Sequence, residues 1–282
     1  MSGMGFLLKV SRFRFWIYTA GTYVVGYSLG ASSLEDFFRL EYFAFLLYFF
    51  FPANVFIYGV NDYYDRDTDA LNPKKDGMEH RVAESERRTL VRGLQAVLLI
   101  SAALFIFLDL TAALLFLGFL GLSYFYSAPP LRFKARPFLD FSSNMLYIMP
   151  GILAYYLASG SLPSVWLVAA GFLHIAAMHL FSAVPDIECD RQAGITTSAV
   201  LLGKRVSLLL CLLFWSGLAA LALMLTGFHY LSFLVLLYPA VPLSLLAFSS
   251  WRVERVYWYL PYLNTILGGM LFTVLVLLLA VG

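Results

Sequence analysis

The side chains best suited to chemistry in this chain are carboxylates gathered directly after a long apolar run. Asp62, Asp65 and Asp69 fall at positions i, i+3 and i+7, so they share one face if the segment is helical. Carboxylates this close repel one another unless cations lie between them. The spacing therefore predicts a site for a hard divalent cation such as Mg²⁺, which takes one or two protein carboxylates and completes its shell with water and substrate phosphate.

Two simpler interpretations of this acidic run compete with a catalytic metal site. An acidic run is most often a solvated loop. Asp65, Asp67 and Asp69 also fit the first, third and fifth positions of a calcium-binding EF-hand loop. That loop needs Gly at its turn and Glu at its end, whereas Ala70 and Asp76 stand there, so the calcium interpretation fails.

A second acidic pair, Asp186 and Asp190, follows another apolar run. One helical turn separates the two residues, so both can face the same cation. Two such clusters on opposite sides of a cavity can hold metal ions that bridge one diphosphate. Arg81 lies in the loop after the first cluster, and Arg132 and Lys134 follow the run at residues 126–130; these basic side chains would neutralise the charge that develops as diphosphate leaves.

The chain that carries these motifs has the composition of a membrane protein. Of its 282 residues 61% are hydrophobic and 13% are charged, and the mean hydropathy is +0.79. Its apolar runs are about 20 residues long, which matches the thickness of a bilayer core, and no alternating pattern indicates a β-barrel. We therefore predict an all-α polytopic membrane bundle. Cys189 and Cys211 fit neither a disulfide framework nor a metal-ligand spacing.

Apolar runs bounded by charged residues, Pro or Gly predict nine transmembrane helices. In chain order they cover 12–30, 40–62, 89–108, 111–127, 139–158, 163–185, 205–226, 230–249 and 256–280. The first is kept as a membrane helix because no signal-peptide cleavage site follows it. Residues 1–282 are expected to form a single domain of two related halves, about 12–127 and 139–249, followed by the ninth helix.

The basic residues give these helices an orientation, because Lys and Arg accumulate in cytoplasmic loops. Of the 19 Lys and Arg residues, only Arg39 falls on the side opposite the rest. We therefore expect a cell-membrane protein with a cytoplasmic N-terminus, an outside C-terminus and an active site at the cytoplasmic face. An ion transporter, the rival from another class, would carry its acids near the membrane midplane. His174 and His179 are expected to be hydrogen-bonded structural residues.

Taken together, the motifs resemble those of the UbiA superfamily of intramembrane prenyltransferases, and the likeness covers nearly the whole chain. The family pattern N-D-x-x-D-x-x-x-D is matched by Asn61, Asp62, Asp65 and Asp69. Its second pattern, D-x-x-x-D, is matched by Asp186 and Asp190, with Gly194 following. The segment from Tyr126 to Lys134 resembles the Tyr and Lys segment of the family.

This resemblance implies a helical bundle around a central cavity that opens sideways to lipid, with Mg²⁺ and an allylic diphosphate under a cytoplasmic cap. One Mg²⁺ would be bound by Asn61, Asp62 and Asp65, and the other by Asp186 and Asp190. Asp69 would support either a metal or a basic partner. The implied diphosphate-binding residues are Arg81, Lys134, Arg132, Tyr126 and Arg12.

Three shorter runs resemble lycopene elongases, which build fifty-carbon carotenoids: residues 11–16, 126–137 and 184–188. This likeness implies transfer from dimethylallyl diphosphate to the ends of lycopene. Residues 126–130 also resemble chlorophyll synthases, so chlorophyllide, an aromatic or quinone precursor and a glycerol phosphate stay open as acceptors. Tyr58, Tyr126 or Tyr147 is expected to stabilise an allylic cation through its ring face. Membrane lipid is an expected partner, and nucleic acid is not.

Overall fold

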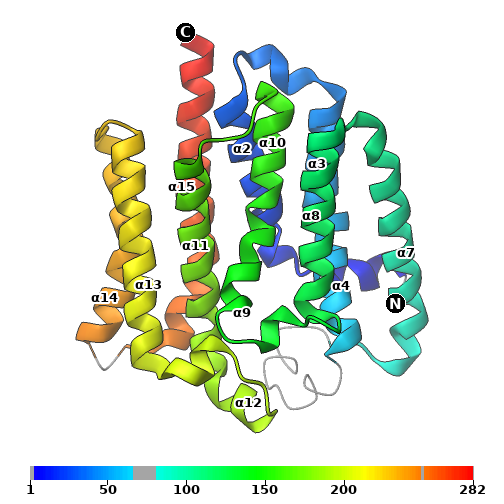
Figure 1. Ribbon diagram of the computed structural model, residues 1–282, viewed down its shortest axis with the longest axis vertical. Helices are drawn as coiled ribbons and strands as arrows, with labels where there is room; N and C mark the ends of the chain where they lie inside the picture. The colour runs from blue at the N-terminus through cyan, green and yellow to red at the C-terminus, as the bar shows by residue number, and fades with distance from the viewer. Residues whose placement is uncertain (1–2, 66–80, 249–250, 282) are drawn as a thin grey trace. The chain divides into compact units, whose positions relative to one another are not determined.

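The computed structural model describes residues 3–65, 81–248 and 251–281, and within these ranges every regular element is helical (Figure 1). Seven helices there are long and apolar enough to cross a membrane: 40–64, 84–107, 110–127, 165–192, 198–225, 230–247 and 253–281. They overlap seven of the nine predicted spans. The prediction of an all-α fold is thus confirmed for the described ranges, and these seven helices have the length and apolar composition of membrane spans.

The two other predicted spans, 12–30 and 139–158, are helical but broken into short pieces. The first consists of a 3₁₀ turn at Phe13–Phe15, a π-helical turn at Ile17–Gly21 and helix α2 at Thr22–Gly30. The second consists of α9 at Leu139–Ser142, a 3₁₀ segment at Ser143–Tyr147 and α10 at Met149–Ser159. Because neither is one continuous helix, the number nine remains a prediction.

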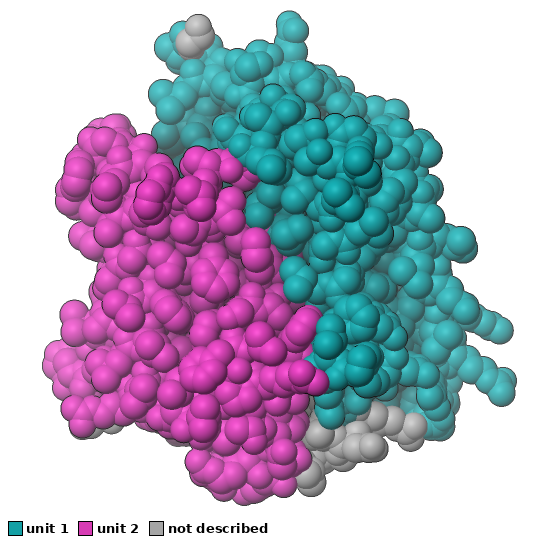
Figure 2. Space-filling view, viewed as in Figure 1, with its two compact units in different colours: residues 1–132, 149–162, 268–282 teal, residues 133–148, 163–267 magenta. Residues whose placement is uncertain are grey.

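The chain divides into two compact units, which Figure 2 shows in different colours. The first contains residues 1–132, 149–162 and 268–282, and the second contains residues 133–148 and 163–267. The prediction of one domain with two related halves stays a prediction, because these units are defined by packing and carry no test of internal relatedness.

In the first unit, α2 and α10 pack with their backbones in contact. A Cβ atom on Gly26 would lie 2.1 Å from the carbonyl oxygen of Gly151, and one on Gly30 would lie 2.6 Å from that of Tyr155. Small residues are what permit two membrane helices to approach this closely. The remaining long helices of this unit are α3 (Leu40–Phe50), α4 (Pro52–Tyr64), α7 (Arg87–Leu104) and α8 (Leu110–Ser127).

A kink separates α3 from α4 and sets the direction in which α4 runs. Pro52 has no backbone N–H to donate, so the helix ladder is interrupted at this point. The buried side-chain amide of Asn54 donates to the carbonyl oxygens of Phe49 and Phe50 at 3.0 and 3.1 Å, and to Thr19 Oγ1 at 2.8 Å. The carbonyl groups of Phe49 and Phe50, which lack helix partners because α3 ends at Phe50, thereby gain partners inside an apolar core, where an unpaired polar group is costly.

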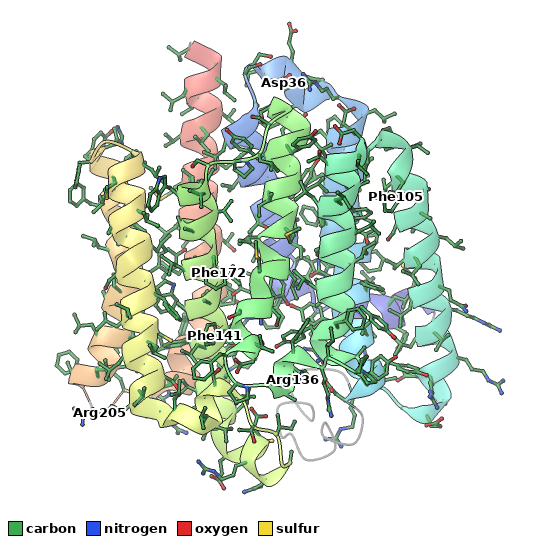
Figure 3. All side chains as sticks on the ribbon, viewed as in Figure 1. Asp36, Phe105, Arg136, Phe141, Phe172 and Arg205 are labelled. Carbon is green, nitrogen blue, oxygen red and sulfur yellow. The ribbon has the colours of Figure 1, made fainter. Side chains whose placement is uncertain are left out.

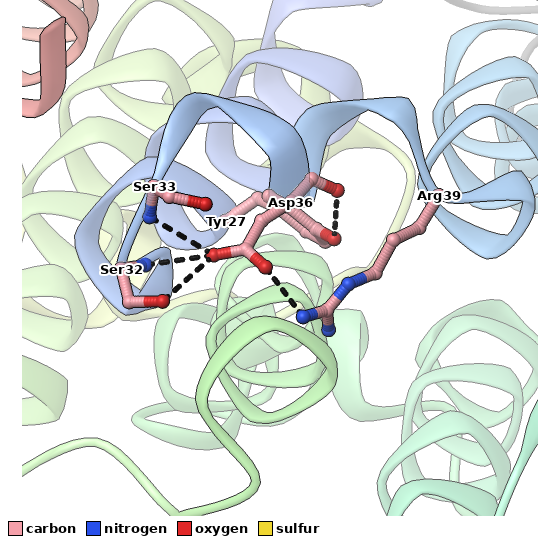
Figure 4. Close-up of polar contacts among 5 residues, drawn as sticks. All are labelled: Tyr27, Ser32, Ser33, Asp36 and Arg39. Carbon is pink, nitrogen blue, oxygen red and sulfur yellow. Dashed lines mark hydrogen bonds and ion pairs between the residues drawn. The ribbon is translucent and has the colours of Figure 1, made fainter.

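The loop between α2 and α3 lies at the end of the first unit opposite the C-terminus of α4 (Figures 1 and 3). Asp36 organises it: Oδ2 accepts from Ser32 N at 2.8 Å and Ser33 N at 3.1 Å, and Oδ1 accepts from Arg39 (Figure 4). Tyr27 Oη donates to the Asp36 carbonyl oxygen at 2.8 Å. Burial would raise the pKa of Asp36, but these donors and Arg39 outweigh it and hold the pKa below its ordinary value.

The second unit is built from five further helices. They are α11 (Val165–Ala183), α12 (Ile187–Gln192), α13 (Ser198–Leu225), α14 (Leu237–Ala247) and the first part of α15 (Val253–Val281). His174 in α11 accepts a hydrogen bond from Trp215 Nε1 at 3.3 Å, and Tyr238 Oη donates to Asn264 Oδ1 at 2.8 Å. The prediction that His174 is hydrogen-bonded is therefore confirmed, and its structural role stays a prediction.

Candidate active site

The first acidic motif lies at the C-terminal end of α4. Asn61 and Asp62 are in its last turns and Asp65 is its C-terminal cap, while Asp69 lies outside the described residues. The side chains of Asp62 and Asp65 are each only 2% exposed. The C-terminus of a helix carries a partial negative charge, which disfavours carboxylates. Two buried carboxylates in this position need cations close by.

Each of these buried carboxylates is paired with an arginine from a distant part of the first unit. Arg12 Nη2 donates to Asp62 Oδ1 at 2.9 Å, and Arg132 Nη2 donates to Asp65 Oδ1 at 3.2 Å. Both arginines have left-handed backbones, with φ of 51° and 40°. That conformation costs an L-residue about 1–2 kcal/mol. The ion pairs therefore coincide with local backbone strain, which is a frequent feature of functional sites.

The Arg12 guanidinium also stacks on an aromatic ring. Its central carbon lies 4.7 Å from the ring centroid of Tyr58, which is one helical turn before Asp62 on α4. Phe15 lies against the same tyrosine, with 6.0 Å between ring centroids. Tyr58 is one of the tyrosines predicted to stabilise an allylic cation, and in this structure Arg12 covers a face of its ring. Tyr58 and Asp62 together hold the guanidinium.

Asn61 connects the motif to the end of α8. Its Nδ2 donates to Asp65 Oδ2 at 2.6 Å and to Ser127 Oγ at 3.1 Å, so Oδ1 is the side-chain atom that could bind a cation. In the described residues no three His, Cys, Asp or Glu side chains converge into a metal cage. Two carboxylates and one carboxamide oxygen nevertheless fit Mg²⁺, which prefers oxygen ligands and keeps water and substrate phosphate in its remaining positions.

The other predicted phosphate-binding residues lie at or near the ends of α7 and α8 in the sequence. Tyr126 is in the last turn of α8, and Arg81 is exposed shortly before α7. Lys134 lies in a 3₁₀ turn at Phe133–Ala135, which belongs to the second unit. Of the predicted set, the structure thus brings Arg12 and Arg132 into ion pairs with the first motif.

The second acidic motif is held in the second unit by a tight helix end. Asp186 ends a 3₁₀ turn and Asp190 lies in α12. The helix stops in a Schellman motif, in which Gly194 N donates to Arg191 O at 3.1 Å and Ile195 N donates to Asp190 O at 2.9 Å. Gly194 has a φ of 70°, the left-handed conformation that favours glycine.

Beyond its backbone, Asp190 has a side-chain partner that the sequence did not indicate. Its Oδ2 accepts a hydrogen bond from Thr197 Oγ1 at 3.4 Å. Asp140, which is fully buried, was also missed. It falls inside the predicted span 139–158, and a lone carboxylate in a membrane span is a functional candidate by default, so that signal was present.

Comparison with known proteins gives consistent results. The UbiA prenyltransferase family matches residues 19–258. A lycopene elongase/hydratase of Haloferax volcanii is 45% identical over 269 residues, which is 94% of this chain and 87% of that protein. One from Halobacterium salinarum is 41% identical over 275 residues, 95% of each chain. A UbiA homolog from Archaeoglobus fulgidus, solved with DMAPP and Mg²⁺, has a TM-score of 0.74 and 21% identity, covering 96% of this chain and 98% of its own.

Proposed function

The chain belongs to the UbiA prenyltransferase family, and from this premise we propose that it transfers a prenyl group from an allylic diphosphate to a lipophilic acceptor. The observation that carries the proposal is the pair of buried carboxylates at the end of α4, each neutralised by an arginine. Such a site is suited to a polyanionic substrate together with its counter-ions. In an ion transporter the transported ion binds to such carboxylates, whereas here an arginine pairs with each of them.

We assign the metal ligands as Asn61, Asp62 and Asp65 at the first motif and Asp186 and Asp190 at the second. Asp69 supports the first motif. A bound Mg²⁺ would act as a Lewis acid that stabilises charge on the leaving diphosphate. The protein's own contribution is to bind and orient this group with Arg12, Arg81, Tyr126, Arg132 and Lys134, since arginine matches phosphate oxygens in a bidentate geometry.

The reaction we propose breaks the bond between the allylic carbon and the diphosphate oxygen, and the electron pair leaves with the diphosphate. An electron-rich double bond of the acceptor then supplies the pair for the new carbon–carbon bond. The acceptor is left as a tertiary cation, which either loses a proton or captures water. Water must stay away from the allylic cation until the new bond has formed.

For the acceptor we propose lycopene, and for the donor dimethylallyl diphosphate. Support comes from the two haloarchaeal relatives described as lycopene elongase/hydratase and from their coverage of nearly the whole chain. The test is expression in lycopene-producing cells, with Asp62→Asn as the matched inactive control. Carotenoids heavier by one or two prenyl units, with or without added water, are expected from the wild type alone.

A different result would be that the same membranes leave lycopene unchanged and prenylate an aromatic acid, chlorophyllide or a glycerol phosphate. That outcome would show that lycopene is the wrong acceptor, while prenyl transfer would stand as the reaction. Absence of diphosphate release with every allylic diphosphate and acceptor would overturn the enzymatic proposal itself. We further propose that the N-terminus and the active site face the cytoplasm and that the C-terminus faces outward.

A further inference from the structure

Asp140 is a carboxylate of the second unit that neither acidic motif includes. It is 0% exposed, and its side chain accepts three hydrogen bonds. Ser198 N donates to Oδ2 at 2.6 Å, Ser198 Oγ donates to Oδ1 at 2.5 Å, and Phe141 N donates to Oδ1 at 2.9 Å. Ser198 is the first residue of α13, so the carboxylate also lies at the favourable end of that helix dipole.

The same serine ties a second segment to this point. Ser198 Oγ accepts from Phe138 N at 2.6 Å, and the ring of Phe141, labelled in Figure 3, lies 5.6 Å from that of Phe214 in α13. Residues 138–141 are therefore fixed on the start of α13. Arg136 and Pro137 separate them from the 3₁₀ turn that carries Lys134.

Thr197, the neighbour of Ser198, continues the connection to the second acidic motif. It is the N-cap of α13, where its hydroxyl accepts from Val200 N at 3.3 Å, and it donates to Asp190 Oδ2 at 3.4 Å. A backbone shift at Ser198 would move Thr197 with it, since the two residues share a peptide bond. A continuous set of contacts thus leads from buried Asp140 to the carboxylate of Asp190.

We propose that Asp140 is a positioning residue, which acts through Ser198 and Thr197 to hold Asp190 and the Lys134 segment in one rigid frame. The proposal rests on the proposed function, because it takes Asp190 to be a metal ligand. Groups that orient metal ligands typically contribute about 10–100-fold to metal affinity. The hydroxyl contact of Thr197 is long, so the lower end of that range is expected.

The experiment measures Mn²⁺ binding by electron paramagnetic resonance to purified full-length protein in detergent, with inorganic pyrophosphate present, alongside thermal unfolding. Thr197→Val removes the donor at nearly constant volume, whereas Thr197→Ser keeps it. Ser164→Ala is the matched control, because Ser164 caps α11 in the same way without a contact to an acidic motif. Asp140→Asn tests the buried anchor directly.

We expect Mn²⁺ affinity to fall about tenfold in Thr197→Val and Asp140→Asn, as for loss of other groups that orient metal ligands. Thr197→Ser and Ser164→Ala should keep wild-type affinity, although Ser164→Ala should lower the unfolding temperature as much as Thr197→Val does. Wild-type affinity in Thr197→Val would overturn the positioning proposal, even if Asp140→Asn fails to fold. Asp190→Ala distinguishes failure of the positioning proposal from failure of the proposed function. If this variant also binds Mn²⁺ with wild-type affinity, Asp190 is not a metal ligand and the metal assignment of the proposed function is wrong.

Discussion

Replacing Arg12 by Met should expose how much the first acidic motif depends on its arginines. The side chain of Arg12 is 14% exposed and that of Asp62 is 2% exposed, so the substitution removes the guanidinium that lies 2.9 Å from a buried carboxylate. Breaking a buried ion pair by removing one partner costs about 3–5 kcal/mol. Loss of the contact with the Tyr58 ring is part of the same change and accounts for about 0.5–2 kcal/mol of it.

Two controls separate charge from backbone strain. Arg12→Gly removes the same charge but relieves the left-handed backbone, so it should destabilise by about 1–2 kcal/mol less than Arg12→Met. The double variant Arg12→Met with Asp62→Asn should recover most of the loss, because the carboxylate that Arg12 neutralises is then absent as well.

The assay is denaturant unfolding of the purified protein in mixed micelles, with EDTA and then with excess Mg²⁺. In EDTA, the free energy of unfolding of Arg12→Met should be lower than that of the wild type by the full amount of about 3–5 kcal/mol. Mg²⁺ should raise the free energy of unfolding more for this variant than for the wild type, because a cation then replaces the guanidinium. A loss below about 1 kcal/mol in EDTA, the range of exposed ion pairs, would refute the reasoning, since Asp62 would then be hydrated rather than buried.

Three further outcomes follow from the site and from the loop at the opposite end of the first unit. Asp186→Ala and Asp190→Ala should each lower diphosphate release from an allylic diphosphate by about 100- to 1000-fold, the usual effect of removing one electrostatic group, and chelation of Mg²⁺ should abolish it reversibly. The pKa of Asp36 is lowered in the folded protein, so this residue stabilises the fold above the ordinary carboxyl pKa, and the stabilisation is lost as pH falls through the folded pKa. In a plot of unfolding free energy against pH, Asp36→Asn should therefore lose less stability at acid pH than the wild type. An unchanged acid dependence would contradict this. Cysteines placed at Lys204 should react only from the cytoplasmic side and those at Ser161 only from outside, and the reverse labelling would overturn the orientation.

The sequence predicted the long helices and the acidic residues because both depend on local spacing. Apolar runs of membrane thickness define the helices, and the interval between Asp62 and Asp65 defines a common face. The two broken spans could not be predicted in the same way. Thr19 and Asn54 stabilise the interrupted backbone across a separation of 35 residues, and hydropathy carries no information on such contacts.

Spacing in the sequence could not predict the ion pairs between the arginines and the first acidic motif either. Arg12 meets Asp62 across 50 residues and Arg132 meets Asp65 across 67, and both depend on left-handed backbone conformations that a non-glycine residue rarely adopts. Asp140 is different, since its position within an apolar segment was visible. Its partner Ser198 lies 58 residues away, so spacing alone could not show what this carboxylate contacts.

The backbone contact between α2 and α10 has a consequence for the traffic of hydrophobic molecules. Where a Cβ atom on Gly26 has no room, a lipid tail or a polyene has none either, and the contact recurs one turn later at Gly30. The stretch of the α2–α10 interface from Gly26 to Gly30 is therefore closed to any chain that diffuses within the bilayer. The lipophilic acceptor that we propose would have to enter elsewhere, and bulky substitutions at Gly26 should push α2 and α10 apart rather than widen an entrance.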